Sequence, residues 1–229
     1  MAIIRQARPD DIPGIAVVVR QVWDQALLPD VCVSQIQQKN SALWVAAIDE
    51  RVVGFVSAFV TVGADGLRRW EVDLLAVLAE SRGQRLGQRL VDLICRDAPR
   101  DVAMARAIIH EDNRASQITF ERAGFAKNGR RYAFLLWPPD SDGVPVYEGA
   151  VNLIPVDTVT YRGLWIEGLD EVDSQAQRQA VTAARTLVGR GGRSNAGALV
   201  PEDEARLDDS VRQAAERVGV YQQFYRKLM

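Results

Sequence analysis

A strand-like segment that runs into a glycine-containing turn and then a helix restricts the fold of this chain most strongly. Residues 71–77 (EVDLLAV) are typical of a strand, and residues 81–88 (SRGQRLGQ) contain Gly83 and Gly87. The helix expected over residues 85–97 begins at this turn, so its free N–H groups and dipole create positive potential there. Pyrophosphate binds well at such helix N-termini. A capped turn between a strand and a helix would show the same short pattern, so both interpretations stay open.

The first 138 residues alternate between strand-like and helix-like segments. Strands are expected over residues 3–8, 43–48, 52–62, 69–77, 103–109 and 132–137. Helices are expected from Asp10 or Asp11 to Trp23, and over residues 33–39, 85–97 and 115–123. This order predicts an α/β fold of the α+β type, in which helices flank a mixed, mostly antiparallel sheet.

Four short motifs follow one another along this region in the order and spacing of a known family. They are Ile4–Ala7 with Asp10 and Asp11, the segment Trp44–Phe55, the turn Arg82–Gly87 and the segment Asn113–Phe125. Together they resemble the GNAT superfamily of acyl-CoA-dependent N-acetyltransferases over about residues 2–138. The turn reads RGQRLG where the family pattern is [Q/R]xxGx[G/A], so Arg85 stands in place of the central glycine.

The resemblance implies that acetyl-CoA is the co-substrate and that no metal is needed. In the family, the pantetheine arm lies in a notch where two strands separate, and the matching strand here contains Leu75, Ala76 and Val77. The backbone N–H of Leu75 would then polarise the thioester carbonyl. The pyrophosphate would lie on the turn before the helix. The residues expected around it are Arg82, Gly83, Gln84, Arg85, Leu86, Gly87 and Gln88.

Three positions of the segment 113–125 complete the cofactor site that the resemblance implies. Asn113 would bond pantetheine or cap the following helix, and both roles fit its position. Ser116 would reach the pyrophosphate or bond the preceding helical turn. Phe120 stands where the family has a tyrosine that protonates the leaving thiolate. A phenyl ring cannot donate a proton, so we expect Phe120 in the core or against pantetheine.

The acceptor amine must lose a proton before it attacks, because an alkylammonium group has a pKa of about 10. The resemblance implies Glu71 as the general base, since the histone-acetylating branch has a glutamate at this offset before the turn. Strand alternation places Asp73 on the same side unless a bulge intervenes. The alternative for Glu71 is an ion pair with Arg68 or Arg69 on a solvated surface. The alternative for Asp73 is likewise a structural role.

Other reactive side chains give weaker signals. Three tyrosines are candidates for the missing acid by residue type alone: Tyr132, Tyr147 and Tyr161. The single histidine, His110, excludes a site with several histidine ligands, and we expect it to be structural or exposed rather than catalytic. Cys32 and Cys95 show no metal-ligand or disulfide spacing and are expected in the core.

The cluster of chain-breaking residues from Trp137 to Pro145 predicts a domain boundary. We predict an acetyltransferase-like domain over residues 1–138, a linker over 139–145 and a smaller α/β extension over 146–229. The extension is expected to contain strands over 144–154 and 158–166, a helix over 174–188, a mobile loop over 189–197 and one or two helices over 202–228. It would serve as a lid on the acceptor site or as an arm for oligomerisation, such as a homodimer.

The charge balance limits the partners. The chain has 28 basic and 30 acidic residues, so its net charge of −2 gives no general attraction to nucleic acid or to an anionic membrane. With no signal peptide and no membrane span, we expect a cytoplasmic protein. The sequence predicts an N-acetyltransferase acting on a small-molecule or peptide amine, with a weak preference for a cationic one. The alternative is a non-catalytic acyl-CoA-binding module whose C-terminal part binds a protein partner.

Overall fold

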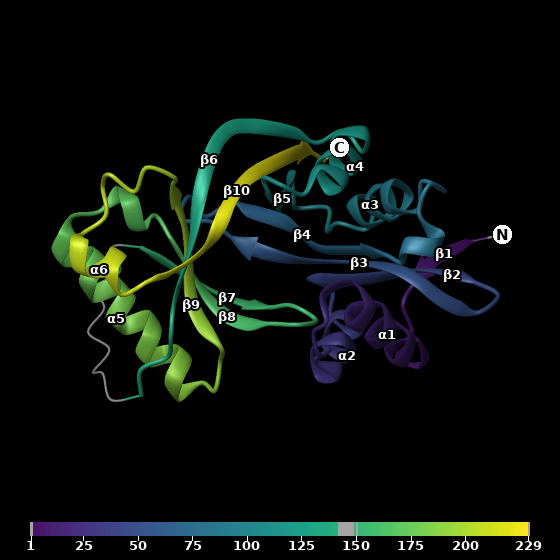
Figure 1. Cartoon of the computed structure of the whole chain (residues 1–229), viewed down its shortest axis with the longest axis horizontal. Helices are drawn as coiled ribbons and strands as arrows, with labels where there is room; N and C mark the ends of the chain where they lie inside the picture. Colours follow the sequence, from purple (N-terminus) through teal and green to yellow (C-terminus); the bar gives the residue numbers. More distant parts are fainter. Residues whose placement is uncertain (1, 142–148, 150, 229) are drawn as a thin grey trace.

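A ten-stranded mixed sheet runs through the whole protein, with helices packed on both of its faces (Figure 1). The computed structural model describes residues 2–141, 149 and 151–228. Its order of strands is β1-β2-β3-β4-β5-β10-β6-β9-β8-β7, and most neighbours are antiparallel. Only the pairs β4–β5 and β8–β9 are parallel among the described strands. The predicted fold class is therefore confirmed.

The bounds of the elements follow the predicted ones closely up to residue 125. The strands are β1 (Ile3–Gln6), β2 (Ser41–Ile48), β3 (Arg51–Val62), β4 (Arg68–Val77), β5 (Met104–His110), β6 (Ala126–Trp137), β7 (Asn152–Asp157), β8 (Arg162–Glu167), β9 (Asn195–Pro201) and β10 (Glu216–Lys227). The α-helices are α1 (Ile12–Trp23), α2 (Pro29–Gln37), α3 (Leu86–Arg96), α4 (Arg114–Arg122), α5 (Ser174–Arg190) and α6 (Asp209–Gln213).

The last strand of the chain lies in the middle of the sheet. β10 pairs with β5 on one side and with β6 on the other, so Tyr221 faces both His110 and Tyr132. The prediction of one or two helices over residues 202–228 is therefore wrong, apart from the five-residue helix α6. Residues 217–225 (RVGVYQQFY) are rich in valine and aromatic side chains, which favour a strand once two neighbouring strands offer free edges.

Other expectations for the second half either need correction or concern residues that the structure describes only in part. The loop expected over residues 189–197 is shorter, because α5 continues to Arg190 and β9 begins at Asn195. The expected strand over 144–154 and the linker over 139–145 fall largely on residues 142–148 and 150, which are not described. Since β10 returns to the first half, we propose to assign residues 216–227 to the acetyltransferase-like unit and to treat the preceding segment as an insertion.

Two large hydrophobic cores and a third, small cluster around Phe59 and Ile154 support this arrangement. The first lies between β1–β5 and the helices α1–α4, and it includes Phe55, Trp70 and, from the end of the chain, Phe224. The second lies under α5 and α6 and includes Trp137 and Val188. In Figure 1, the long strands β6 and β10 connect the two halves of the sheet.

A hairpin of the second half reaches back to the first. The turn between β7 and β8 carries Val159, which is fully buried in the first core and whose carbonyl accepts a 2.7 Å hydrogen bond from the Leu28 N–H. Arg162 also forms an ion pair with Asp30 on α2. These contacts attach the β7–β8 hairpin to the α1–α2 region, in agreement with its position in Figure 1.

The central position of β10 in the sheet leads to a prediction for the stability of variants in this strand. Phe224 is fully buried, so Phe224→Ala should lower the free energy of unfolding by about 3–5 kcal/mol through lost burial and a residual cavity. Val218 lies on the same strand with 42% of its surface exposed, and Val218→Ala should cost no more than about 0.5 kcal/mol. Chemical denaturation of both variants would check this, and equal costs would contradict the central position of β10.

Candidate active site

The site begins where two parallel strands separate. β4 and β5 pair at three positions, from Arg69 opposite Met104 to Glu71 opposite Arg106. Beyond Glu71, no further β4–β5 pairs occur in the described part of the chain, while β5 continues against β10. The gap has the form of the notch that the sequence resemblance implied.

A bulge in β4 lies at the mouth of this gap. Leu75 faces Val56 and Val72 faces Ala58, so both Asp73 and Leu74 lie opposite a single residue of β3, Ser57. The extra residue interrupts the simple alternation of side chains along β4. Asp73 and Glu71 nevertheless line the same cavity, as we expected for two carboxylates near the notch.

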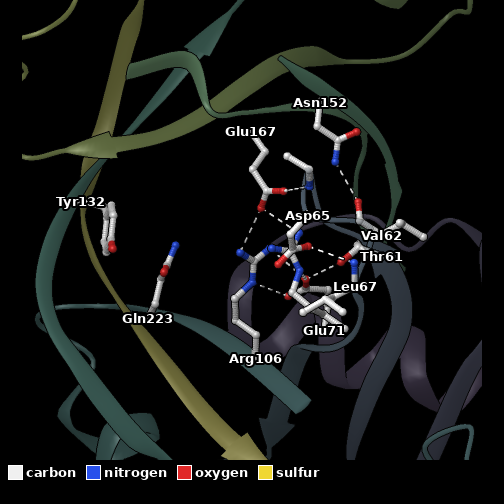
Figure 2. Close-up of polar contacts among 12 residues, drawn as sticks. Thr61, Val62, Asp65, Leu67, Glu71, Arg106, Tyr132, Asn152, Glu167 and Gln223 are labelled. Carbon is white, nitrogen blue, oxygen red and sulfur yellow. Dashed lines mark hydrogen bonds and ion pairs between the residues drawn. The ribbon is translucent and has the colours of Figure 1, made fainter. Parts of the chain in front are cut away.

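Glu71 is fully engaged in a buried ion pair. Only 2% of its surface is exposed, and its carboxylate accepts two hydrogen bonds from Arg106, from Nη2 at 2.8 Å and Nε at 2.9 Å. The hydroxyl of Thr61 donates a third bond of 2.6 Å (Figure 2). The Glu71 carboxylate thus accepts hydrogen bonds from Arg106 and Thr61 of the protein itself. The alternative expectation was an ion pair with Arg68 or Arg69 on a solvated surface. Nε of Arg69 does lie 3.7 Å from Glu71, but this pairing is buried.

A second carboxylate reaches the same cluster from the other half of the sheet. Glu167, at the end of β8, lies 2.7 Å from Nη2 of Arg69 and 3.5 Å from Nη1 of Arg106. It also accepts a 3.1 Å hydrogen bond from the Ala64 N–H (Figure 2). Two arginines thus balance two glutamates. Burial acts to lower the pKa of Arg106, but the negative charges of Glu71 and Glu167 outweigh it, and the net effect raises that pKa.

Asp73 differs from its neighbours because it has no counter-charge in the described part of the chain. Its Oδ2 atom is buried and has no hydrogen-bond partner there. Burial raises the pKa of Asp73 to about 7, and the negative charge of Glu71 adds to the effect. A carboxyl group with this pKa can hold or release a proton near neutral pH, as a general base requires.

These groups line a cavity of about 430 Å³ between the two halves of the sheet. β4 and β5 contribute one wall, the β7–β8 hairpin and β9 contribute the opposite wall, and β6 and β10 lie between them. Most of the lining is apolar, with the charged cluster at one side. Mostly apolar concave sites with a few polar groups are typical of small-molecule binding.

The turn before α3 has the features expected of a phosphate cradle. Gly83 has φ +80° and the residue before the helix, Arg85, has φ +57°, so both adopt the left-handed conformation. Arg85 thus occupies a backbone conformation that favours glycine, and its side chain is exposed. A Cβ atom on Gly87 would lie 3.3 Å from the Thr119 side chain, so this glycine also permits close packing of α3 against α4.

The residues of the second motif lie on α4. The Asn113 side chain accepts a 3.1 Å hydrogen bond from the Ser116 N–H, which confirms its role as helix cap and leaves a second bond to pantetheine a prediction. Phe120 is 3% exposed, and its ring packs edge-on against Phe125 with centroids 5.0 Å apart. Phe120 is therefore a core residue.

The remaining candidates are distributed around the cavity. Tyr161 lines it but donates to the Asn195 carbonyl at 3.0 Å, and burial raises its pKa to about 12. Tyr132 accepts a bond from Asn128 and stands apart from the charged cluster in Figure 2. Tyr147 lies outside the described residues. His110 accepts a 3.2 Å bond from the Asp112 N–H and packs against Tyr221.

Sequence reasoning missed three residues of this site. Arg106 was the single charged residue in the expected apolar strand 103–109, and a buried charge there requires a partner. Glu167 and Tyr221 gave no comparable signal, because the expected boundaries placed one at a strand end and the other in a helix. Cys32 and Cys95 are buried as expected, and burial raises the pKa of each thiol to about 12.

No group of three potential metal-binding side chains occurs among residues 2–141, 149 and 151–228. Within the same residues, no helix is both long and apolar enough to cross a membrane.

Residues 11–125 match the model of the acetyltransferase (GNAT) family. The chain belongs to this family. The fold is shared with solved acetyltransferases, although sequence identities are low. A putative acetyltransferase from Pyrococcus horikoshii is 11% identical, with a TM-score of 0.62 over 99% of this chain and 89% of that one. Arabidopsis thaliana NAA60 in complex with acetyl-CoA is 13% identical, with a TM-score of 0.52 over 58% of this chain and 88% of that one.

A third likeness covers the second half of the sheet as well. It is the GCN5-related glucosamine N-acetyltransferase region of a fungal multi-domain GH3 β-N-acetylglucosaminidase. That chain is 13% identical, with a TM-score of 0.63 over 99% of this chain and 38% of that one. The GNAT fold together with its additional strands is therefore an arrangement that other chains share.

The raised pKa of Asp73 leads to a prediction for the stability of this GNAT protein as a function of pH. A carboxyl whose pKa is raised in the folded state binds its proton more tightly there, so ionising it costs stability as pH rises from about 4 to about 7. Asp73→Asn removes this cost and should raise the free energy of unfolding at pH 8 by roughly 2–4 kcal/mol. The gain should vanish near pH 4.

Denaturation at both pH values would measure the difference. Asp10→Asn, at an exposed carboxyl, is the matched control and should show no comparable gain at either pH. A gain for Asp73→Asn that does not change with pH would contradict the raised pKa.

Proposed function

We propose that this protein transfers the acetyl group of acetyl-CoA to a primary amine by direct attack in the gap between β4 and β5. Membership of an acetyltransferase family supports the reaction class. The observation that carries the mechanism is the carboxyl of Asp73 beside the gap, whose buried Oδ2 atom has no hydrogen-bond partner in the described part of the chain. Asp73 would take one proton from the ammonium group, and the neutral amine would then form a bond to the thioester carbon. The carbon–sulfur bond would break, and the second proton lost by the nitrogen would pass to the departing thiolate.

Asp73 is a better candidate for the base than Glu71. Three donors already bond the Glu71 carboxylate, and a proton taken there would have to displace the Arg106 pair. We propose that Glu71 instead positions the site, because its charge helps to keep the pKa of Asp73 near 7. No tyrosine acid is required, because a free thiol has a pKa of about 8.5 and its thiolate is a tolerable leaving group.

The cofactor residues proposed from sequence fit this arrangement. The backbone of Leu75, Ala76 and Val77 continues β4 beyond its last pair with β5, and residues 84–88 form the end of the turn and the start of α3. Two positive φ angles in and beside that turn direct backbone N–H groups outward, and the exposed Arg85 adds positive charge. We propose that the pantetheine arm lies along β4 and that the pyrophosphate lies on the turn.

The same site could in principle bind acyl-CoA without turnover, with the second half of the sheet serving a protein partner. The core position of Phe120 favours that alternative, because the family tyrosine is absent. An acyl-CoA-binding module, however, has no need of an unpaired carboxyl beside the thioester, so Asp73 favours transfer. For the insertion we propose the role of a lid, since the β7–β8 hairpin lines the cavity.

Calorimetric titration with acetyl-CoA tests the cofactor site. We expect one site with a dissociation constant in the micromolar range. Arg85→Gln should weaken binding about three- to tenfold, because it removes a charge beside the pyrophosphate. Arg96→Gln is the matched control, since this exposed arginine lies at the other end of α3 and should leave affinity unchanged. No heat of binding at millimolar acetyl-CoA would contradict the proposal.

The pH dependence of kcat/KM tests the base. We expect activity to rise with pH up to about 7, as Asp73 ionises, and Asp73→Asn should lower kcat/KM by about 10²–10⁴ and abolish this limb. Glu71→Gln should instead move the limb to lower pH, because it removes a negative charge and leaves Arg106 with only the longer contact to Glu167. If the limb disappeared in Glu71→Gln and persisted in Asp73→Asn, Glu71 would be the base.

A further inference from the structure

The charges around the cavity leave a place for one positive charge. Glu71 and Glu167 are balanced by Arg69 and Arg106, through contacts of 2.7–3.7 Å. Asp73 forms no ion pair in the described part of the chain, and its buried Oδ2 atom has no hydrogen-bond partner there. A single cation placed against Asp73 would neutralise the charge that remains.

The wall opposite the charged cluster is apolar and partly aromatic. Trp165 and Ile154 contribute to it from the β7–β8 hairpin, Phe134 from β6 and Tyr221 from β10. Phe134 and Tyr221 contact each other edge-on, with ring centroids 5.6 Å apart. An acceptor rich in hydroxyl groups would lose hydrogen bonds to water on entering these surroundings, whereas an apolar body would gain free energy by leaving water.

The hairpin that carries this wall is held in place. The buried Val159, the Leu28–Val159 backbone hydrogen bond and the Asp30–Arg162 ion pair attach it to the helices of the first half. Gln35 adds a 3.3 Å hydrogen bond to the carbonyl of Asp157. A fixed wall and a cavity of about 430 Å³ favour a compact acceptor over a long polyamine or a folded protein surface.

We propose that the acceptor is a small primary amine with one positive charge on an aromatic or branched apolar body. Its ammonium group would lie against Asp73 and its body against Trp165 and Tyr221. This inference rests on the proposed function, since it names the substrate class of the same site. It distinguishes this chain from an enzyme for amino sugars or for amines with several charges.

Equilibrium binding to the full chain, saturated with CoA so that no transfer occurs, tests the proposal. 2-Phenylethylamine has both the charge and the apolar body, ethylamine lacks the body, and 2-phenylethanol lacks the charge. Glucosamine and putrescine represent polar and doubly charged amines. At pH 8, where Asp73 is ionised, we expect 2-phenylethylamine to bind at least about tenfold more tightly than each of the other four.

Two variants separate the contributions. Asp73→Asn should lower the affinity for 2-phenylethylamine to that for 2-phenylethanol, and leave the latter unchanged. Trp165→Leu should weaken the binding of 2-phenylethylamine several-fold and leave the affinity for ethylamine unchanged. Asp10→Asn is the control for both variants. Equal or tighter binding of glucosamine, putrescine or ethylamine would overturn the inference. Absence of 2-phenylethylamine binding up to 10 mM, or an unchanged affinity in Asp73→Asn, would do the same.

The outcomes also separate this inference from the proposed function. Tight binding of the apolar amine without acetyl transfer would support the acceptor pocket and contradict the catalytic role. Transfer to glucosamine in preference to 2-phenylethylamine would support the enzyme and contradict the acceptor class.

Discussion

The buried pair between Glu71 and Arg106 is the interaction on which the rest of the site depends. It joins β4 to β5 at the last position where the two strands are paired, so it lies directly at the start of the gap. Removing one partner of such a pair leaves an uncompensated charge away from water and typically costs about 3–5 kcal/mol. Glu167 joins the same cluster from β8, so the pair also attaches the second half of the sheet to the first.

This cluster determines what Asp73 can do. Because Arg69 and Arg106 are both taken by glutamates, neither is left to neutralise the third carboxylate. The bulge lies at Asp73, which lines the cavity with its Oδ2 atom buried, so solvation only partly replaces the missing counter-ion. Under the proposed function, the protein keeps an energetically unfavourable group at the position where the base acts, a trade of stability for activity that is common at catalytic sites.

The first half of the fold and the glycine-containing turn before α3 could be predicted because their signals are local. The glycine positions, the apolar face of α3 and the motif order are all visible within short windows of sequence. β10 could not be recognised in this way, since what makes residues 216–227 a strand is the pair of edges offered by β5 and β6, more than 75 residues earlier in the sequence. Strand alternation predicted that Glu71 and Asp73 lie near one another, and both line the same cavity. Arg106 and Glu167, which complete the charged cluster, lie on β5 and β8 and have no fixed sequence spacing from them.

The return of the chain to β5 and β6 also affects which residues would determine the acceptor substrate. The insertion begins after β6 and ends before β10, and these two strands are neighbours in the sheet. Both of its ends are therefore held by backbone hydrogen bonds, and its far hairpin is held by the buried Val159. Apart from Glu167, which pairs with Arg69 and Arg106, side chains of β7 and β8 that line the cavity can change without disturbing β4, the strand that carries Glu71 and Asp73. Under the proposed function, selection for a different acceptor would act on the insertion together with Phe134 and Tyr221, while the proposed base stays on β4.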